Sequence, residues 1–178
     1  KGKEARQFDA SEVFTSYFDQ RETVAKEREA KLNEIKQQNL LKFDALKSKS
    51  TTTASGLQYQ ITTKGNGAAV KSTNNATVHY AVYFADGSLL ETSNLEIAEV
   101  NNEVNFQRKK ANQYNPIQAR VGPNDSMIEG FKEGLRLLNQ GDRATLFLNY
   151  NIAYGEKGVQ GIPPRSNLIF EVEIVSVD

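Results

Sequence analysis

Apolar and polar positions follow a helical period in the first third of the chain. From Ser11 to Lys47 there is neither glycine nor proline, and Glu, Lys, Gln, Ala and Leu are abundant, which favours a helix. Its apolar positions are spaced mostly by three, four or seven residues; they are Phe14, Phe18, Ala25, Leu32, Ile35, Phe43 and Leu46. Because this stripe is thin, we predict a helical arm or linker that is solvated or packed on a partner. Asp9 or Ser11 can cap its start.

The period changes to that of strands after residue 56. The segment "LQYQITTK" (57–64) alternates apolar and polar residues, and "ATVHYAVYF" (76–84) stops at Asp86 and Gly87, a hairpin-turn signal. Two more strands are predicted over "RATLFLNY" (143–150) and "NLIFEVEIVSV" (167–177). Hairpin signals between strands indicate that the sheet is antiparallel.

One short helix is predicted among these strands, from Asp125 to Asp142. Asp125 or Ser126 can cap its start, and Gly141 suits its C-terminal cap. Its apolar stripe consists of Ile128, Phe131, Leu135 and Leu138. The fold class is therefore α+β: a twisted antiparallel sheet wrapped around one short helix and preceded by the N-terminal helical arm.

Two segments interrupt the periodic pattern. "SKSTTTASG" (48–56) is polar and rich in turn-forming residues, which marks a boundary. The polar, Asn-rich segment from about 94 to 116 is typical of an insertion in a loop, with a short helix of its own. We therefore predict an arm or linker over residues 1–50 and a domain over residues 55–178 that contains the insertion.

Composition excludes several kinds of site. The 178 residues suffice for one domain plus an appendage, and 22 basic against 22 acidic residues favour no nucleic-acid partner. The absence of cysteine excludes disulfides, thiolate zinc sites and a cysteine nucleophile. No apolar run approaches the roughly 20 residues that span a bilayer. Because the sequence begins at Lys1 rather than Met, we expect a processed or truncated product.

Polar catalytic groups are also few. His79 is the only histidine, so a histidine metal cluster is impossible, and within a strand we expect it to be structural. Glu171 and Glu173 alternate with the apolar residues of the last strand, which predicts a solvated face for both. The remaining candidates are apolar residues on or beside the strands, the short helix and the loops, and each one alone fits a core position.

The order of motifs along the second part of the chain adds a more specific hypothesis. It runs from "VHYAVYFADGSLLETS" through "GFKEGLRLLNQGDRATLFL" to "AYGEKGVQGIPPRSNLIFEVEI". These motifs closely resemble the FKBP family of peptidyl-prolyl cis-trans isomerases, from about Ser55 to Asp178 apart from the insertion. The segment "SGLQYQITTKGNG" (55–67) looks like the domain entry of the bacterial envelope branch, which includes the macrophage infectivity potentiators.

The resemblance implies which residues form the site. Those expected to form the catalytic pocket are Tyr80, Tyr154, Phe170, Phe131 and Ile128; those expected to bind substrate are Leu90, Glu91, Ile117, Met127 and Ile162. Leu90 and Ile117 stand where the family often has Phe, Glu91 replaces the usual Asp, and the loop after Tyr154 is one residue shorter. These departures make the pocket less aromatic.

The resemblance also implies an activity. We expect rotation about X–Pro bonds in exported proteins, promoted by an apolar pocket with no metal, cofactor or covalent step. The alternative is a chaperone or binding module of the same fold with weak or no isomerase activity. The insertion is either decoration or a flap that contacts substrate, since it joins Ser93 to Pro116 at the pocket rim.

Partners and location follow from the same resemblance. The expected ligands are proline-containing unfolded or partly folded polypeptides and macrolide immunosuppressants. A homodimer through the N-terminal helix is one hypothesis, and a solvated arm is the other. The expected location is the periplasm or cell envelope, with a lipoprotein anchor outside this sequence as one form.

Overall fold

The computed structural model describes residues 9–178, which form two compact units that divide after Glu34. Helix α1 (Ala10–Lys47) begins at the predicted cap, since the Asp9 carboxylate accepts a hydrogen bond from the Ser11 N–H over 2.9 Å. The described part of the first unit belongs almost entirely to this helix. From residue 9 to residue 34 the side chains are exposed except that of Leu32, which is half-buried, and this agrees with the thin apolar stripe in the sequence.

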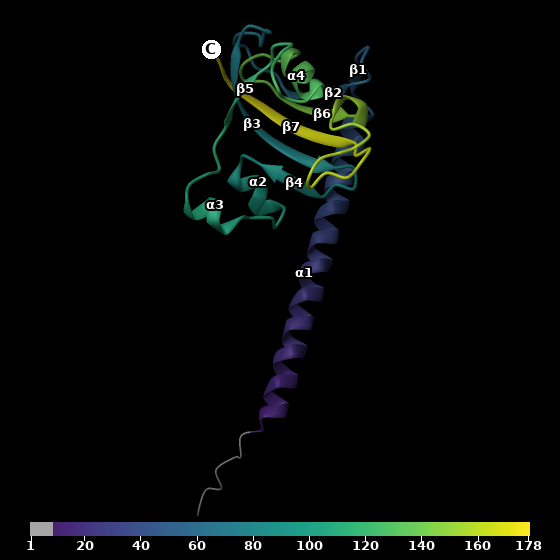
Figure 1. Cartoon of the computed structure of the whole chain (residues 1–178), viewed down its shortest axis with the longest axis vertical. Helices are drawn as coiled ribbons and strands as arrows, with labels where there is room; N and C mark the ends of the chain where they lie inside the picture. Colours follow the sequence, from purple (N-terminus) through teal and green to yellow (C-terminus); the bar gives the residue numbers. More distant parts are fainter. Residues whose placement is uncertain (1–8) are drawn as a thin grey trace, which may run out of the picture. The chain divides into compact units, whose positions relative to one another are not determined.

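The second unit, from Ile35 to Asp178, is built on one antiparallel sheet of seven strands in the order β1-β2-β6-β7-β3-β4, with β5 paired to β3 (Figure 1). The strands are β1 (Thr51–Thr52), β2 (Gln58–Thr63), β3 (Asn75–Phe84), β4 (Leu89–Thr92), β5 (Ile117–Arg120), β6 (Arg143–Leu148) and β7 (Leu168–Val177). The α+β class with an antiparallel sheet is confirmed. The four predicted strands correspond to β2, β3, β6 and β7, each within two residues at either end.

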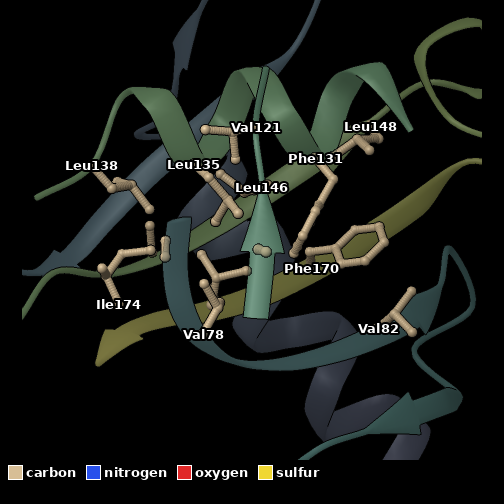
Figure 2. Close-up of a cluster of buried hydrophobic side chains, with 14 of the residues drawn as sticks. Val78, Val82, Val121, Phe131, Leu135, Leu138, Leu146, Leu148, Phe170 and Ile174 are labelled. Atoms are coloured by element: carbon tan, nitrogen blue, oxygen red, sulfur yellow. The ribbon is translucent and has the colours of Figure 1, made fainter. Parts of the chain in front are cut away.

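Helix α4 (Glu129–Arg136) covers the inner face of this sheet (Figures 1 and 2). The predicted stripe is confirmed at Phe131, Leu135 and Leu138, which are buried against apolar residues of β3, β6 and β7. Each Å² of apolar surface removed from water stabilises the fold by about 25 cal/mol. This contact is therefore the main source of stability in the unit.

The expected limits and caps of this helix were wrong. The N-cap is Ile128, which makes no side-chain cap hydrogen bond, and the helix ends before Leu137. Asp125 instead accepts a hydrogen bond from the Gly122 N–H over 2.8 Å and so closes the preceding loop. Gly141 has φ +88° and lies in a turn beyond the helix. The flanking polar residues therefore stabilise loops and do not extend the helix.

Two glycines let α4 lie close to the sheet. A Cβ on Gly134 would lie 2.4 Å from the Cδ1 of Leu146, and one on Gly130 would lie 2.7 Å from the Cγ of Leu148. Each glycine costs a helix about 1 kcal/mol relative to alanine. The short distance between α4 and β6 accounts for their presence.

The outer face of the sheet is covered by the last part of α1, from Ile35 onward. Phe43 is 2% exposed, and its ring centroid lies 4.9 Å from that of Tyr83 in an edge-to-face contact. The Tyr83 hydroxyl donates to Glu171 over 2.8 Å, and the Lys42 ammonium lies 2.9 Å from the same carboxylate. Burial and the negative charge of Glu171 raise the pKa of Tyr83. The solvated position expected for Glu171 was therefore wrong, because the end of α1 partly covers it.

The same part of α1 also contacts the β3–β4 turn. The Asn39 side-chain amide donates to the Gly87 carbonyl and to the Asn101 side-chain oxygen, each over 2.9 Å. Gly87 has φ +82°, and a Cβ there would lie 2.6 Å from the Lys36 carbonyl oxygen. A glycine is required at this turn both by its backbone conformation and by the nearby helix.

Among the described residues, no helix has the length and apolar character that crossing a membrane requires.

Phe43→Ala should lower the free energy of unfolding by about 3–5 kcal/mol, because it leaves a cavity between α1 and the sheet. Leu41→Ala, in the same turn of helix but 72% exposed, should change it by less than about 0.5 kcal/mol. Urea denaturation of the full chain measures both. Equal effects of the two substitutions would contradict this packing of α1.

Candidate functional site

The floor of the candidate site lies where β3, β7 and α4 meet. The Phe131 and Phe170 rings lie 5.1 Å apart between centroids (Figure 2). Phe170 pairs across the sheet with Val82, and Val172 pairs with Tyr80, so the side chains of all four lie on the inner face. Ile128 packs against the same cluster from the start of α4. Three elements far apart in sequence thus form one apolar floor.

A groove of about 620 Å³ lies beside β4 and borders the same apolar cluster through Leu90 and Ile162. Its walls come from β4, from the insertion after it, and from the loop that precedes β7. The lining residues include Leu90 and Glu91 of β4, Glu103, Val104, Asn105, Arg108 and Tyr114 of the insertion, and Tyr154, Val159, Gln160 and Ile162 of the loop.

The loop before β7 folds back on itself at the groove. The N–H and C=O groups of Val159 and Ile162 bond to each other over 3.0 and 2.9 Å, which closes a tight turn. Gly158 and Gly161 have φ of +66° and +82°, conformations that glycine adopts without strain. The turn buries Ile162, which is 8% exposed, and leaves Tyr154 37% exposed at the rim.

A polar network borders the groove at Tyr80. The pKa of Tyr80 is raised to about 12, mainly by burial and next by the negative charge of Glu91. Arg108 opposes this shift, and its guanidinium lies 3.7 Å from the Glu91 carboxylate. Tyr154 also raises the pKa of Tyr80 slightly. Near neutral pH the Tyr80 hydroxyl is therefore a protonated hydrogen-bond donor.

The insertion is an ordered wall of the groove. It contains two short helices, α2 (Leu95–Val100) and α3 (Phe106–Lys110), where one was predicted. Asn94 and Asn105 cap them by accepting hydrogen bonds from backbone N–H groups. Arg108 lies over the Tyr114 ring, 4.5 Å from its centroid, and the Tyr114 hydroxyl accepts from the Asn105 N–H over 2.9 Å. Whether the insertion is decoration or a flap that contacts substrate stays a prediction.

The structure brings nine of the ten predicted residues to the floor or the groove. Phe131, Phe170, Tyr80, Ile128 and Met127 belong to the inner cluster or pack against it, while Leu90, Glu91, Tyr154 and Ile162 line the groove. Ile117 is half-buried on β5 opposite Val78 and is in neither set. The role of every one of these residues in binding or catalysis stays a prediction.

Sequence reasoning did not single out the insertion residues Glu103, Arg108 and Tyr114. Their polar, weakly periodic segment has no feature that separates them from a solvated loop. The only available signal was that the insertion starts and ends next to predicted pocket residues.

A second cavity, of about 430 Å³, lies over the outer face of the sheet between the end of α1 and α2. Four of its charged residues form two pairs: Lys42 with Glu171 over 2.9 Å, and Arg143 with Glu173 over 3.1 Å. His79, which also borders it, lies with its Nδ1 3.0 Å from the Ser93 hydroxyl. Within residues 9–178, no cluster of three or more His, Cys, Asp or Glu side chains is arranged to hold a metal ion.

Comparisons with known proteins agree on one family. Residues 66–175 match the model of the FKBP-type peptidyl-prolyl cis-trans isomerase family. The "Probable FKBP-type peptidyl-prolyl cis-trans isomerase FkpA" of Neisseria meningitidis is 32% identical, over 99% of this chain and 60% of that protein. FkpA of Escherichia coli K12 is 30% identical, over 85% of this chain and 48% of that protein. The chain thus spans about half the length of these relatives.

Solved structures share the fold. The crystal structure of Escherichia coli FkpA superposes with a TM-score of 0.58 at 26% identity, and covers 97% of this chain and 74% of that one. A peptidyl-prolyl cis-trans isomerase from Pseudomonas syringae gives a TM-score of 0.58 at 23% identity, over 84% of this chain and 95% of that one, which is a likeness of fold alone.

The polar network can be tested by titration. Glu91→Gln should lower the pKa of Tyr80 from about 12, because loss of the negative charge favours the phenolate. Arg108→Ala should raise the pKa of Tyr80 further, because the opposing cation is lost. NMR titration of ring-labelled tyrosine, assigned with Tyr80→Phe, measures both. Glu99→Gln, in α2 and outside the groove, is the matched control and should leave this pKa unchanged; an unaltered pKa in Glu91→Gln would contradict the network.

Proposed function

We propose, on the premise that this chain belongs to the FKBP-type peptidyl-prolyl cis-trans isomerase family, that its groove binds proline-containing polypeptides and accelerates rotation about their X–Pro bonds. The observation that supports the proposal best is the apolar Phe131–Phe170 floor, with a groove beside its cluster that Tyr154 lines.

The reaction needs no bond to be made or broken. The X–Pro amide has a rotational barrier of about 18–20 kcal/mol because its C–N bond is partly double. Cis and trans forms differ by only about 0.5–1 kcal/mol, so an unfolded chain populates both. Uncatalysed exchange takes roughly 10–100 s, which is slow enough to limit folding.

An apolar floor can favour the twisted amide over the planar one. In the twisted transition state the amide loses resonance and its carbonyl becomes less polar. Transfer from water into a dry site therefore penalises the planar ground state more, and only such differential binding accelerates the step. Phe131, Phe170, Tyr80 and Ile128 would surround the proline ring, with Met127 assisting at the margin.

Hydrogen-bond donors at the edge would fix the peptide on either side of the proline. The Tyr154 hydroxyl, at the rim, is positioned to donate to a substrate carbonyl. In residues 9–178 the Ile128 N–H has no acceptor of its own, as expected for an amide at the start of a helix, so it can hold a second carbonyl. Glu91 orients the Tyr80 hydroxyl through its charge.

The less aromatic margin distinguishes this pocket. Leu90 offers a smaller apolar surface than the phenylalanine common in the family, which should weaken binding of macrolide immunosuppressants more than it slows rotation. We propose these macrolides as ligands of the same floor. A chaperone or binding module without catalysis is the alternative, and family membership favours the isomerase.

An NMR exchange or protease-coupled assay with a short X–Pro peptide tests the activity. The chain should accelerate isomerisation above the uncatalysed rate, and Tyr154→Phe should lower kcat/KM about two- to tenfold, the equivalent of one lost hydrogen bond. Tyr17→Phe in α1 is the matched control and should not alter the rate. Isomerisation no faster than the blank would exclude the enzyme, and retained peptide binding would then indicate the binding module.

We further propose that the protein acts as a folding factor and chaperone for exported proteins in the periplasm or cell envelope. Proline isomerisation limits folding wherever chains arrive unfolded. This proposal is supported by the resemblance of the sequence to the bacterial envelope branch and by the family to which the similar proteins belong.

Homodimer formation through α1 is a separate proposal. Five large apolar side chains of the first unit are about half exposed or more; they are Val13, Phe14, Tyr17, Phe18 and Val24. Contact with a second copy would remove this surface from water.

Phe14→Ser combined with Phe18→Ser should convert a dimer of the full chain to a monomer of 19.8 kDa, because burial of both rings would be lost. Light scattering coupled to gel filtration measures the mass. Gln20→Ser, on the same helix, is the control for helix content and should leave the dimer intact. A parent chain that is monomeric at all concentrations would exclude the proposal.

A further inference from the structure

The charges that line the groove are unbalanced. Three charged side chains line it: Glu91, Glu103 and Arg108. The Arg108 guanidinium lies 3.7 Å from the Glu91 carboxylate and donates to the Thr92 carbonyl over 3.2 Å. It is also held over the Tyr114 ring. The Arg108 guanidinium therefore lies with its positive charge towards Glu91, and the two charges compensate each other.

Glu103 is the remaining charge. Glu103 follows Asn102, which has φ 56°, and the Glu103 N–H donates to the Ala98 carbonyl over 2.9 Å at the end of α2. These contacts fix the backbone that presents the side chain. Among the ion pairs of residues 9–178, none involves the Glu103 carboxylate, while the nearby Lys109 pairs with Glu99 over 2.6 Å. The insertion wall thus carries one uncompensated negative charge.

In the part of the chain that the structure describes, no charged side chain of the loop on the opposite wall lines the groove. Tyr154, Val159 and Gln160 line the loop side of the groove and are neutral at physiological pH. A polypeptide whose proline lies on the floor would pass between this neutral wall and Glu103. Screening lengths of about 8–10 Å at physiological salt let the carboxylate act on side chains within a few residues of the proline.

We propose that Glu103 makes the groove prefer polypeptide segments with Lys or Arg close to the proline over segments with Asp or Glu there. The inference rests on the proposed function, because it assigns a substrate preference to the same groove. Glu103 is a specificity-determining residue in this scheme and takes no part in the rotation itself.

The test uses the full chain and peptides of one sequence, with a single Lys, Ala or Glu at each of the three positions on either side of one proline. NMR exchange spectroscopy gives kcat/KM without a coupling protease. At low salt the Lys peptide should exceed the Glu peptide about two- to fivefold at one or more positions, the effect expected of one exposed charge pair. Raising the salt to about 1 M, where the screening length is about 3 Å, should bring this ratio towards one.

Variants assign the preference to Glu103. Glu103→Gln should bring the Lys-to-Glu ratio towards one, and Glu103→Lys should invert it. Glu99→Gln is the matched control, since it removes an equal charge from α2 outside the groove, and it should leave the ratio unchanged. A change of the ratio in Glu99→Gln equal to that in Glu103→Gln would overturn the assignment.

Failure of the inference is distinguishable from failure of the proposed function. If the Ala peptide is accelerated but the Lys-to-Glu ratio is one at every position, the function stands and the preference is refuted. If no peptide is accelerated, the proposed function fails, and NMR titration of the same peptides decides the preference from their Kd values. Tighter binding of Lys peptides that Glu103→Gln abolishes would support it, and equal Kd values would refute it.

Discussion

The close approach of α4 to the sheet is the constraint on which the rest of the second unit depends. Gly130 and Gly134 allow the helix to lie against Leu146 and Leu148 without a side chain between them. At this separation Phe131 reaches the Phe170 ring. A helix held farther out by a single methyl group would lose that contact, and the floor of the groove would lose its packing.

The sheet is covered on both faces, and the two covers differ in chemistry. On the inner side the contact is almost entirely apolar, and the groove opens at its margin. On the outer side Phe43 and Tyr83 are accompanied by Lys42 and Glu171, which bond within the interface. A polar interface of this kind satisfies its own groups and leaves few for a ligand, whereas the inner margin leaves the groups at the edge of the groove available.

Much of this arrangement was predictable from sequence because periodicity records which face of an element is buried. The alternation from Leu168 to Ile174 gave β7 and its inner face, and the helical spacing gave Phe131, Leu135 and Leu138. Short elements were missed or misplaced: β1 and β5 have two and four residues, too few for a period. The caps of α4 were misplaced because Asp125 and Gly141 are turn residues as well as capping residues. Leu90, Glu91, Tyr154 and Ile162 of the groove were named through the motifs of a family, whereas the groove residues of the insertion match none of these motifs.

The contact between Asn39 and the β3–β4 turn bears on where the folding unit begins. The match to the family model starts at residue 66, yet the turn that leads into β4, with Leu90 and Glu91, is held by Asn39 of α1, 48 residues before Gly87 in the chain. The stretch from Ile35 to Lys47 thus belongs physically to the same compact body as the matched residues, although the family model does not include it. In modular terms, the segment that the family model describes is shorter than the compact unit that contains it, and a recombination event at the start of that segment would separate the groove from its own brace.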